Sequence, residues 1–257
     1  MAEDDRPTSI MSAPPHATEA RVRIAAVGDV HCSKDSAGKL GPLFATVHEV
    51  ADVLLLCGDL TDYGTPEEAH LLVKELASVR VPMVAVLGNH DHESQKPLEV
   101  TQILRDAGIH VLDGDACELH GVGFAGAKGF LGGFGRGTLG SWGEAIVKRF
   151  VQEAIDESLK LESALARLKT EKRIAILHYS PIAGTVVGEP VEIAAFLGCS
   201  RLEEPLMRYP VAAVFHGHAH KGTVEGKTAN GIPVYNVAMP LLLRTYRGEP
   251  PFRVIEV

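Results

Sequence analysis

The stretch Arg21-Val-Arg-Ile-Ala-Ala-Val-Gly-Asp-Val-His31 decides the fold, because it joins a short apolar run to a glycine and two polar residues. The apolar run up to Val27 predicts a buried strand, and Gly28 allows the chain to turn sharply where that strand ends. Asp29 and His31 are two residues apart, so in extended backbone their side chains point to the same side. The stretch therefore predicts a strand that brings a carboxylate and an imidazole to one edge of a sheet.

Four more islands of Asp, Asn and His follow apolar runs farther along the chain. The runs 52–57, 81–87, 173–177 and 211–215 each predict a buried strand. Because the carboxyl ends of neighbouring parallel strands meet at one edge of a sheet, we expect the islands to converge. They are Gly58-Asp59, Gly88-Asn89-His90-Asp91, His178 and Gly217-His218-Ala219-His220.

Together the islands contain residue types that bind divalent metal ions through oxygen or imidazole nitrogen. Asp59 can bridge two ions with its two carboxylate oxygens, while Asn89 offers a neutral carbonyl oxygen. Any one island alone is better explained as a turn or a hydrogen-bonded histidine, so only the complete set predicts a metal centre. The candidate metal ligands are Asp29, His31, Asp59, Asn89, His178, His218 and His220.

The segments between these strands predict helices first and antiparallel strands later. Thr65 is an expected N-cap, because Pro66 and two acidic residues follow it. The repeated order of strand, loop and helix predicts parallel pairing with right-handed crossovers. Helices are expected over 42–50, 65–79, 97–107 and 142–170, hairpin strands over 109–112, 116–120 and 122–125, and further antiparallel strands within 222–257.

Two segments are expected to be flexible. Residues 1–21 carry acids, prolines, Ser and Thr without the apolar core of a secretory signal, which predicts an N-terminal tail. The glycine-rich segment 128–140 predicts a mobile surface loop, because ordering so many glycines costs conformational entropy. Lys128 and Arg136 in this loop are either contacts for a substrate phosphate or ordinary exposed cations.

Composition and charge narrow the class of protein. The chain has 257 residues, of which 46% are hydrophobic and 23% charged, so a soluble domain over residues 22–257 is expected. A net charge of −8 argues against binding to long nucleic acid, whereas bound metal ions would still attract a small anion. No apolar run approaches the roughly 18 residues of a membrane span. Four scattered cysteines favour reduced thiols and a cytoplasmic location.

The five islands resemble the motifs of the calcineurin-like metallophosphoesterase superfamily, which are DxH, GD, GNH[DE], a lone H, and GHxH. All five are present in order, and the resemblance covers roughly residues 22–235. It implies an α/β fold of the metallophosphoesterase type, an α/β/β/α sandwich of two mixed β-sheets flanked by helices. It also implies one metal ion held by Asp29, His31, Asp59 and His220, and a second held by Asp59, Asn89, His178 and His218.

The same resemblance implies a mechanism. A hydroxide that bridges the two ions attacks phosphorus in line, and both ions polarise the phosphoryl oxygens. His90 matches a histidine that stabilises the transition state or protonates the leaving oxygen, and Asp91 either orients His90 or is purely structural. A mixed imidazole, carboxylate and amide set accepts manganese, iron or zinc, and magnesium is also an option.

The second motif helps to choose among the reactions of the superfamily. Protein phosphatases carry GDxxDRG there, whereas this chain has Tyr63 in place of the arginine. The resemblance is to the bacterial branch that includes cyclic nucleotide phosphodiesterases, so a phosphodiesterase of a small phosphate ester, such as a nucleotide, is expected. The alternatives are a broad-specificity phosphomonoesterase and a catalytically idle metal-binding scaffold; a DNA nuclease is disfavoured by the acidic charge. The sequence leaves the oligomeric state open, with a dimer as one option.

Overall fold

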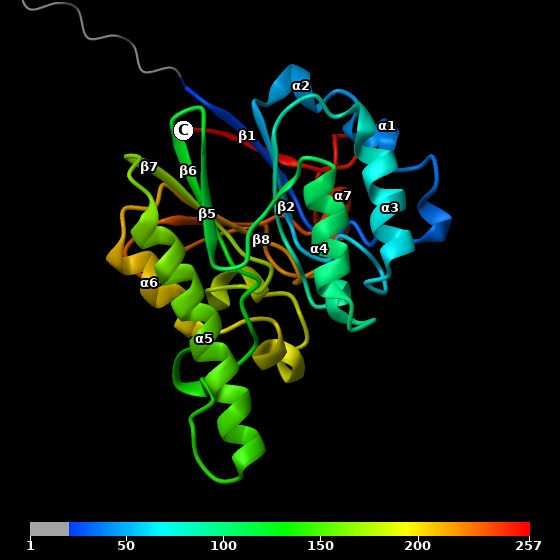
Figure 1. Ribbon diagram of the computed structural model, residues 1–257. Coiled ribbons are helices and arrows are strands. Elements are labelled where there is room, and N and C mark those ends of the chain that lie inside the picture. Colours follow the sequence, from blue (N-terminus) through cyan, green and yellow to red (C-terminus); the bar gives the residue numbers. More distant parts are fainter. Residues whose placement is uncertain (1–20) are drawn as a thin grey trace, which may run out of the picture.

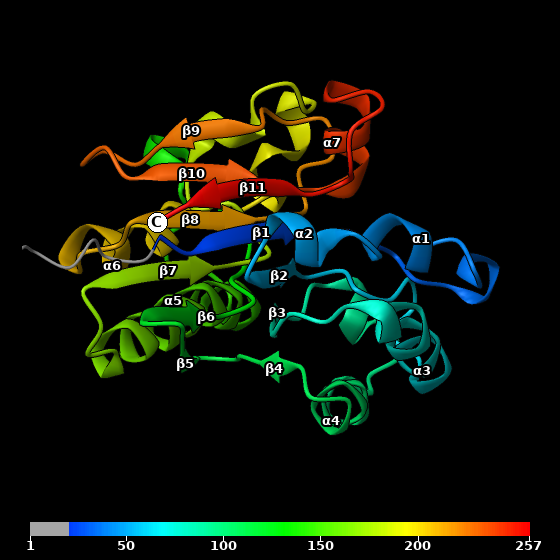
Figure 2. The same ribbon diagram turned by 90° about the horizontal axis from the view of Figure 1, so that it is seen from above.

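The computed structural model describes residues 21–257, which form two β-sheets packed face to face between helical layers (Figure 1). Of the expected N-terminal tail, residues 1–20 lie outside the described part of the chain. Seen from above, the helices α1 to α4 lie on one side of the sheet pair and α5 lies on the other (Figure 2). The expected α/β sandwich of two mixed sheets is thereby confirmed.

The first sheet has five strands in the order β11-β1-β2-β3-β4. The strands from β1 to β4 pair in parallel, and β11 closes one edge by pairing antiparallel with β1. The strands are β1 (Arg23–Val27), β2 (Val53–Cys57), β3 (Met83–Val86), β4 (His110–Val111) and β11 (Arg253–Glu256).

The second sheet has six strands in the order β5-β6-β7-β8-β10-β9. Its four central strands run parallel, and an antiparallel strand closes each edge. The strands are β5 (Asp115–Leu119), β6 (Val122–Gly126), β7 (Lys172–Ile176), β8 (Ala213–His216), β9 (Glu225–Lys227) and β10 (Pro233–Asn236).

The helices cover the outer faces of both sheets. The predicted start of α3 is confirmed, because the Thr65 hydroxyl accepts a hydrogen bond from the Glu68 amide at 3.3 Å and Pro66 takes the first helical position. None of the described helices is long and apolar enough to cross a membrane. The α-helices are α1 (Gly41–Phe44), α2 (Val47–Val50), α3 (Pro66–Glu75), α4 (Pro97–Asp106), α5 (Ala145–Arg167), α6 (Glu203–Arg208) and α7 (Met239–Thr245).

Alternation along the strands divides the buried side chains into three layers. Ile24 and Ala26 of β1 face the second sheet, where they join a core that includes Phe124 and Phe215. Ala25 and its neighbours on the other face pack against α1 to α4. Residues of α5 and α6 cover the outer face of the second sheet. Both sheets are therefore buried on two faces, which explains why their inner strands are continuous apolar runs.

Three expectations about local structure are wrong in whole or in part. The segment 42–50 forms two short helices, α1 and α2, instead of one. Strand β4 forms no hairpin with the strands after it; it pairs in parallel with β3, while β5 and β6 do form the expected hairpin. Within 222–257 the expected antiparallel pairing is present between β9 and β10 and between β11 and β1, but α7 interrupts the strands and β10 also pairs in parallel with β8. The pairing of β4 with β3 and of β10 with β8 depends on which distant strand has a free edge. A short apolar run contains no information about that partner.

Leu161 tests the core beneath α5, because its side chain is fully buried there. Leu161→Ala should lower the free energy of unfolding by about 3 kcal/mol, through lost apolar burial and the cavity left behind. Urea unfolding followed by circular dichroism measures this. The matched control is Leu159→Ala on the same helix, where the side chain is 53% exposed and the change should stay below about 1 kcal/mol. Equal losses for the two variants would contradict the packing of α5.

Candidate metal centre

The islands meet where β1, β2 and β3 of the first sheet and β7 and β8 of the second sheet end. Three groups of side chains have ligand atoms within 4.8 Å of one another. The Asn89 amide oxygen lies 3.0 Å from Nε2 of His178 and so joins them. The groups are Asp29, His31 and His220; His31, Asp59 and His90; and Asp59, His178 and His218. The structure thus brings all seven predicted ligands together with His90.

Two buried carboxylates connect these groups to the backbone of neighbouring loops. Asp29 is 1% exposed and accepts hydrogen bonds from the His218 amide at 2.8 Å and from Nε2 of His220 at 2.8 Å. Asp59 is also 1% exposed, and its Oδ1 accepts a hydrogen bond from the His90 amide at 2.8 Å. Each aspartate therefore links its own strand end to a loop from another strand, and Asp29 does so across the two sheets.

Backbone conformation and unpaired nitrogens both indicate that the residues fit a bound cation. Asp29, His31, Asp59 and His218 have positive φ angles of 56°, 46°, 48° and 68°, a conformation that is uncommon for non-glycine residues, and they are four of the six such residues in the described part of the chain. Both ring nitrogens of His31 are buried and make no hydrogen bond within the described part of the chain. Buried polar atoms normally have partners, so a metal ion at this position would satisfy them.

The imidazoles differ in their electrostatic surroundings. Burial lowers the pKa of His218 to about 4, assisted by the charge of His178, which keeps His218 in the neutral form that a metal ligand needs. Burial also favours neutral His178, but the Asp59 carboxylate outweighs it and raises the pKa of His178 to about 9. In the same pair, burial would raise the pKa of Asp59, and the contact with His178 holds it below its usual value.

His90 and Asp91 are adjacent in sequence but lie in different surroundings. The His90 ring stands edge-on to His31 at 4.6 Å, and its Nδ1 lies 2.7 Å from the Asp62 carbonyl oxygen, which leaves Nε2 available to a substrate. Asp91 is fully buried and accepts hydrogen bonds from the amides of Leu60, Thr61 and Gly88. Asp91 therefore connects the loops after β2 and β3 and makes no hydrogen bond to the His90 ring.

The glycines of the islands have a role that the sequence analysis missed. A Cβ atom added to Gly88 would overlap the Asp59 carboxylate, and one added to Gly217 would overlap the Asp29 carboxylate. A Cβ on Gly58 would likewise overlap the His178 ring. Each glycine therefore makes room for a ligand from a different strand. The signal was present in the sequence, because four of the five islands begin with glycine or contain one directly before a ligand.

The glycine-rich segment 128–140 makes backbone contacts that the sequence does not predict. Its backbone hydrogen-bonds to the loop after β7, through the Gly132 amide to Ala195 and the Gly133 amide to Gly198, both at 2.9 Å. Lys128 is not an exposed cation: burial lowers its pKa, and its Nζ lies 5.0 Å and 5.4 Å from the ring centroids of Phe130 and Tyr179. Arg136 is exposed, as an ordinary surface cation would be.

Comparisons with known proteins agree with this architecture. The family model of calcineurin-like phosphoesterases matches residues 22–222. Among solved structures, phosphopantetheinyl hydrolase (PptH) from Mycobacterium tuberculosis is similar with a TM-score of 0.65 and 13% identity, over 93% of this chain and 97% of that one. The protein TT1561 of Thermus thermophilus is similar with a TM-score of 0.55 and 14% identity, over 92% and 99% of the two chains. A search of curated protein sequences finds no significant match.

The fold and the cluster of ligands define a hydrolase of the metal-dependent class. The match over most of the chain makes the assignment specific: the protein belongs to the calcineurin-like phosphoesterase family, whose members hydrolyse phosphoric esters with divalent metal ions. The two structural neighbours share the fold at low identity and support the architecture alone.

Replacing Gly88 tests whether the close approach of strand ends shapes the metal centre. Gly88→Ala should displace the Asp59 carboxylate and reduce bound metal to below one ion per chain, while the far-ultraviolet circular dichroism spectrum is unchanged. Metal content is measured by inductively coupled plasma mass spectrometry. Gly137→Ala is the matched control, since its Cβ would meet nothing within 4 Å. Full metal content in Gly88→Ala would show that the contact is unimportant.

Proposed function

We propose that the protein is a dimetal phosphodiesterase that hydrolyses a small phosphate ester, such as a cyclic or linear nucleotide. The observation that supports this best is the convergence of the seven ligand residues into groups that share His31 and the buried carboxylate of Asp59. That carboxylate belongs to two of the three ligand groups, which is the placement expected of a bridging ligand. The proposal includes a cytoplasmic location, in keeping with four free cysteines, and one catalytic domain over residues 22–257.

The ligand groups divide into two proposed ion sites. Asp29, His31 and His220 would hold one ion together with Asp59, since the first three form one ligand group and Nε2 of His31 lies 3.8 Å from an Asp59 oxygen. Asn89, His178 and His218 would hold the other ion, again with Asp59. The donors are nitrogen and oxygen atoms, which suit manganese, iron or zinc, and magnesium less well.

The chain's own residues would then perform three tasks. Two bound divalent ions supply Lewis acidity and a nucleophile at neutral pH, and only two ligand carboxylates offset their charge, so the site attracts a phosphate. Asp29 and Asp59 hold the two groups of ligands in register through their amide hydrogen bonds. His90, with Nδ1 held by the Asp62 carbonyl, directs Nε2 toward the leaving oxygen and donates a proton to it.

One observation favours a phosphomonoesterase as the second candidate. Arg244 of α7 donates a hydrogen bond from Nη1 to the His220 carbonyl oxygen at 3.0 Å, which places an exposed guanidinium beside a ligand. A monoester dianion carries one more charge than a diester and gains more from such a cation. Comparing kcat/KM for 4-nitrophenyl phosphate and bis(4-nitrophenyl) phosphate decides between the two candidates.

Asp59→Asn tests the dimetal assignment. Removing the shared carboxylate should lower kcat/KM for bis(4-nitrophenyl) phosphate by about a thousandfold or more, because several kcal/mol of transition-state stabilisation depend on the ions. Bound metal should fall in parallel. Asp106→Asn, on the exposed end of α4, is the control and should retain wild-type activity. Wild-type turnover by Asp59→Asn would reject the assignment, whereas the idle-scaffold alternative requires that the wild-type protein itself show no turnover.

His90→Gln separates acid catalysis from metal binding. The variant should keep its metal ions but lose about a hundredfold or more in kcat with an alkyl leaving group, which needs a proton as it departs. With 4-nitrophenolate, a good leaving group, the loss should be much smaller. The ratio of the two losses is the measurement, and equal losses would indicate that His90 acts on the phosphoryl group instead.

A further inference from the structure

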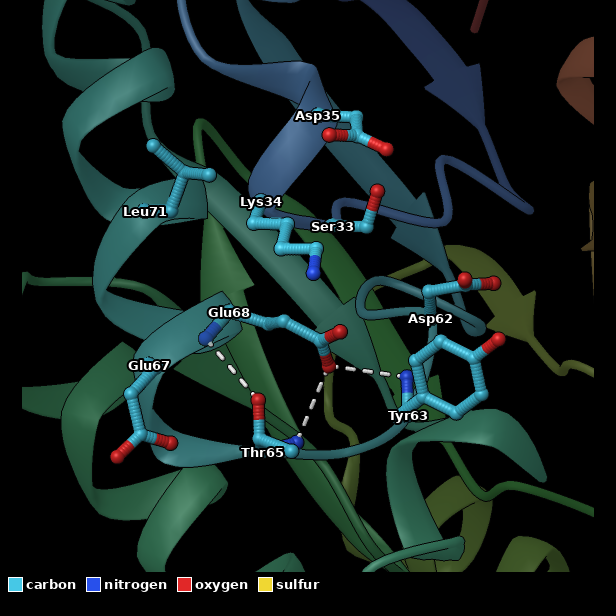
Figure 3. A pocket seen from close by; sticks show the side chains of 9 residues that line it. All are labelled: Ser33, Lys34, Asp35, Asp62, Tyr63, Thr65, Glu67, Glu68 and Leu71. Carbon is cyan, nitrogen blue, oxygen red and sulfur yellow. Dashed lines mark hydrogen bonds between the residues drawn. The ribbon is translucent and has the colours of Figure 1, made fainter.

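A cavity of about 530 Å³ lies directly beside the metal centre, on the side of His31 and His90. Its walls are the segment after β1, the turn after β2 and the first turns of α3 (Figure 3). Asp62 connects it to the site, because its carbonyl oxygen lies 2.7 Å from Nδ1 of His90 and its Oδ1 lies 3.3 Å from Nδ1 of His31. If the leaving oxygen of a substrate lies at His90, the group attached to that oxygen lies next to this cavity.

The cavity is lined by polar groups that are open to a ligand. Glu68 is only 8% exposed, and its Oε2 accepts hydrogen bonds from the amides of Tyr63 and Thr65. Its other oxygen has no hydrogen-bond partner within residues 21–257 and points into the cavity, toward Lys34 (Figure 3). The ammonium of Lys34 and the hydroxyl of Tyr63 make no hydrogen bonds to the described residues either. These three groups are accessible from the cavity and therefore available to a ligand that enters it.

The charge and shape of the lining indicate what the ligand carries. Four carboxylates, those of Asp35, Asp62, Glu67 and Glu68, outnumber the single cation Lys34, which gives the lining a formal charge of −3. Such a wall repels a second phosphate or a carboxylate. The ring of Tyr63 is 60% exposed along this wall and can contact a cation through its π face or a flat group by stacking.

We propose that this cavity binds the leaving group of the substrate and selects an alcohol that carries a cationic amine over one that carries an anionic group. The inference rests on the proposed phosphoesterase function and adds the chemical class of the leaving group to it. Tyr63 occupies the position where the protein phosphatases have a phosphate-binding arginine. At this position the present protein therefore favours a cationic group, whereas the protein phosphatases favour an anionic one. Glu68 has two roles: one oxygen holds the turn at Tyr63, and the other accepts a hydrogen bond from the amine.

Three methyl aryl phosphodiesters of equal size test this selection: the 4-(aminomethyl)phenyl, 4-methylphenyl and 4-carboxyphenyl esters. Wild-type protein loaded with manganese should show kcat/KM about tenfold higher for the aminomethyl than for the carboxy ester, with the methyl ester between them. Asp35→Asn and Glu67→Gln should each reduce that ratio about twofold, the effect of one partly exposed charge. Lys34→Gln should raise it, and Tyr63→Ala should reduce it while Tyr63→Phe retains it.

The matched control is Glu171→Gln, which removes one negative charge at the opposite, amino-terminal end of β7 and should leave the ratio unchanged. Equal kcat/KM values for the three esters would overturn the leaving-group subsite while the phosphoesterase function stands. An equal effect of Glu171→Gln and Glu67→Gln would also overturn it, because the selection would then follow net charge alone. Failure to hydrolyse even methyl 4-nitrophenyl phosphate would instead reject the proposed function and the subsite with it.

Discussion

Hydrogen bonds from the backbone amides of neighbouring loops to buried carboxylates are the constraint on which the site depends. Asp29 reaches across to the His218 amide on the other sheet, Asp59 binds the His90 amide, and Asp91 binds the amides of the loops after β2 and β3. Such charge-assisted bonds are shorter and stronger than neutral ones. They bring the strand ends so close that only glycine fits at the crossing points. The two sheets and the positions of the ligands are thus specified by the same contacts.

The protein itself compensates the charges and polar atoms of the site only in part. Asp29 and Asp59 are almost fully buried and are paired with His220 and His178, whereas the ring nitrogens of His31 make no hydrogen bond to the described residues, and four ligand residues have left-handed backbone angles. Strain and buried charge persist only where surrounding structure or a ligand compensates for them. In the proposed dimetal site, divalent ions would supply that compensation together with a charge that attracts the substrate. In the proposed leaving-group subsite, the acidic cavity beyond His90 would repel a second anion at the opposite end of the substrate.

The sequence predicts the strand ends and their ligands because both are local signals: an apolar run followed by glycine and a ligand residue. The same reasoning fails where an outcome depends on distant partners. Strand β4 has only two residues and takes the free edge of β3, which no local pattern encodes. The 128–140 loop is fixed by contacts with residues 195–198, far away in sequence. The burial of Asp91 and its hydrogen bonds to both loops likewise depend on the folded structure, in which the loops after β2 and β3 lie side by side.

The central claim is that two metal ions share Asp59 at the junction of the two sheets. Anomalous diffraction from crystals grown with manganese tests it most directly, since each bound ion gives its own peak. The account predicts two peaks, one beside Asp29, His31 and His220 and one beside Asn89, His178 and His218, with Asp59 between them. A single peak, or strong peaks that avoid Asp59, would contradict it.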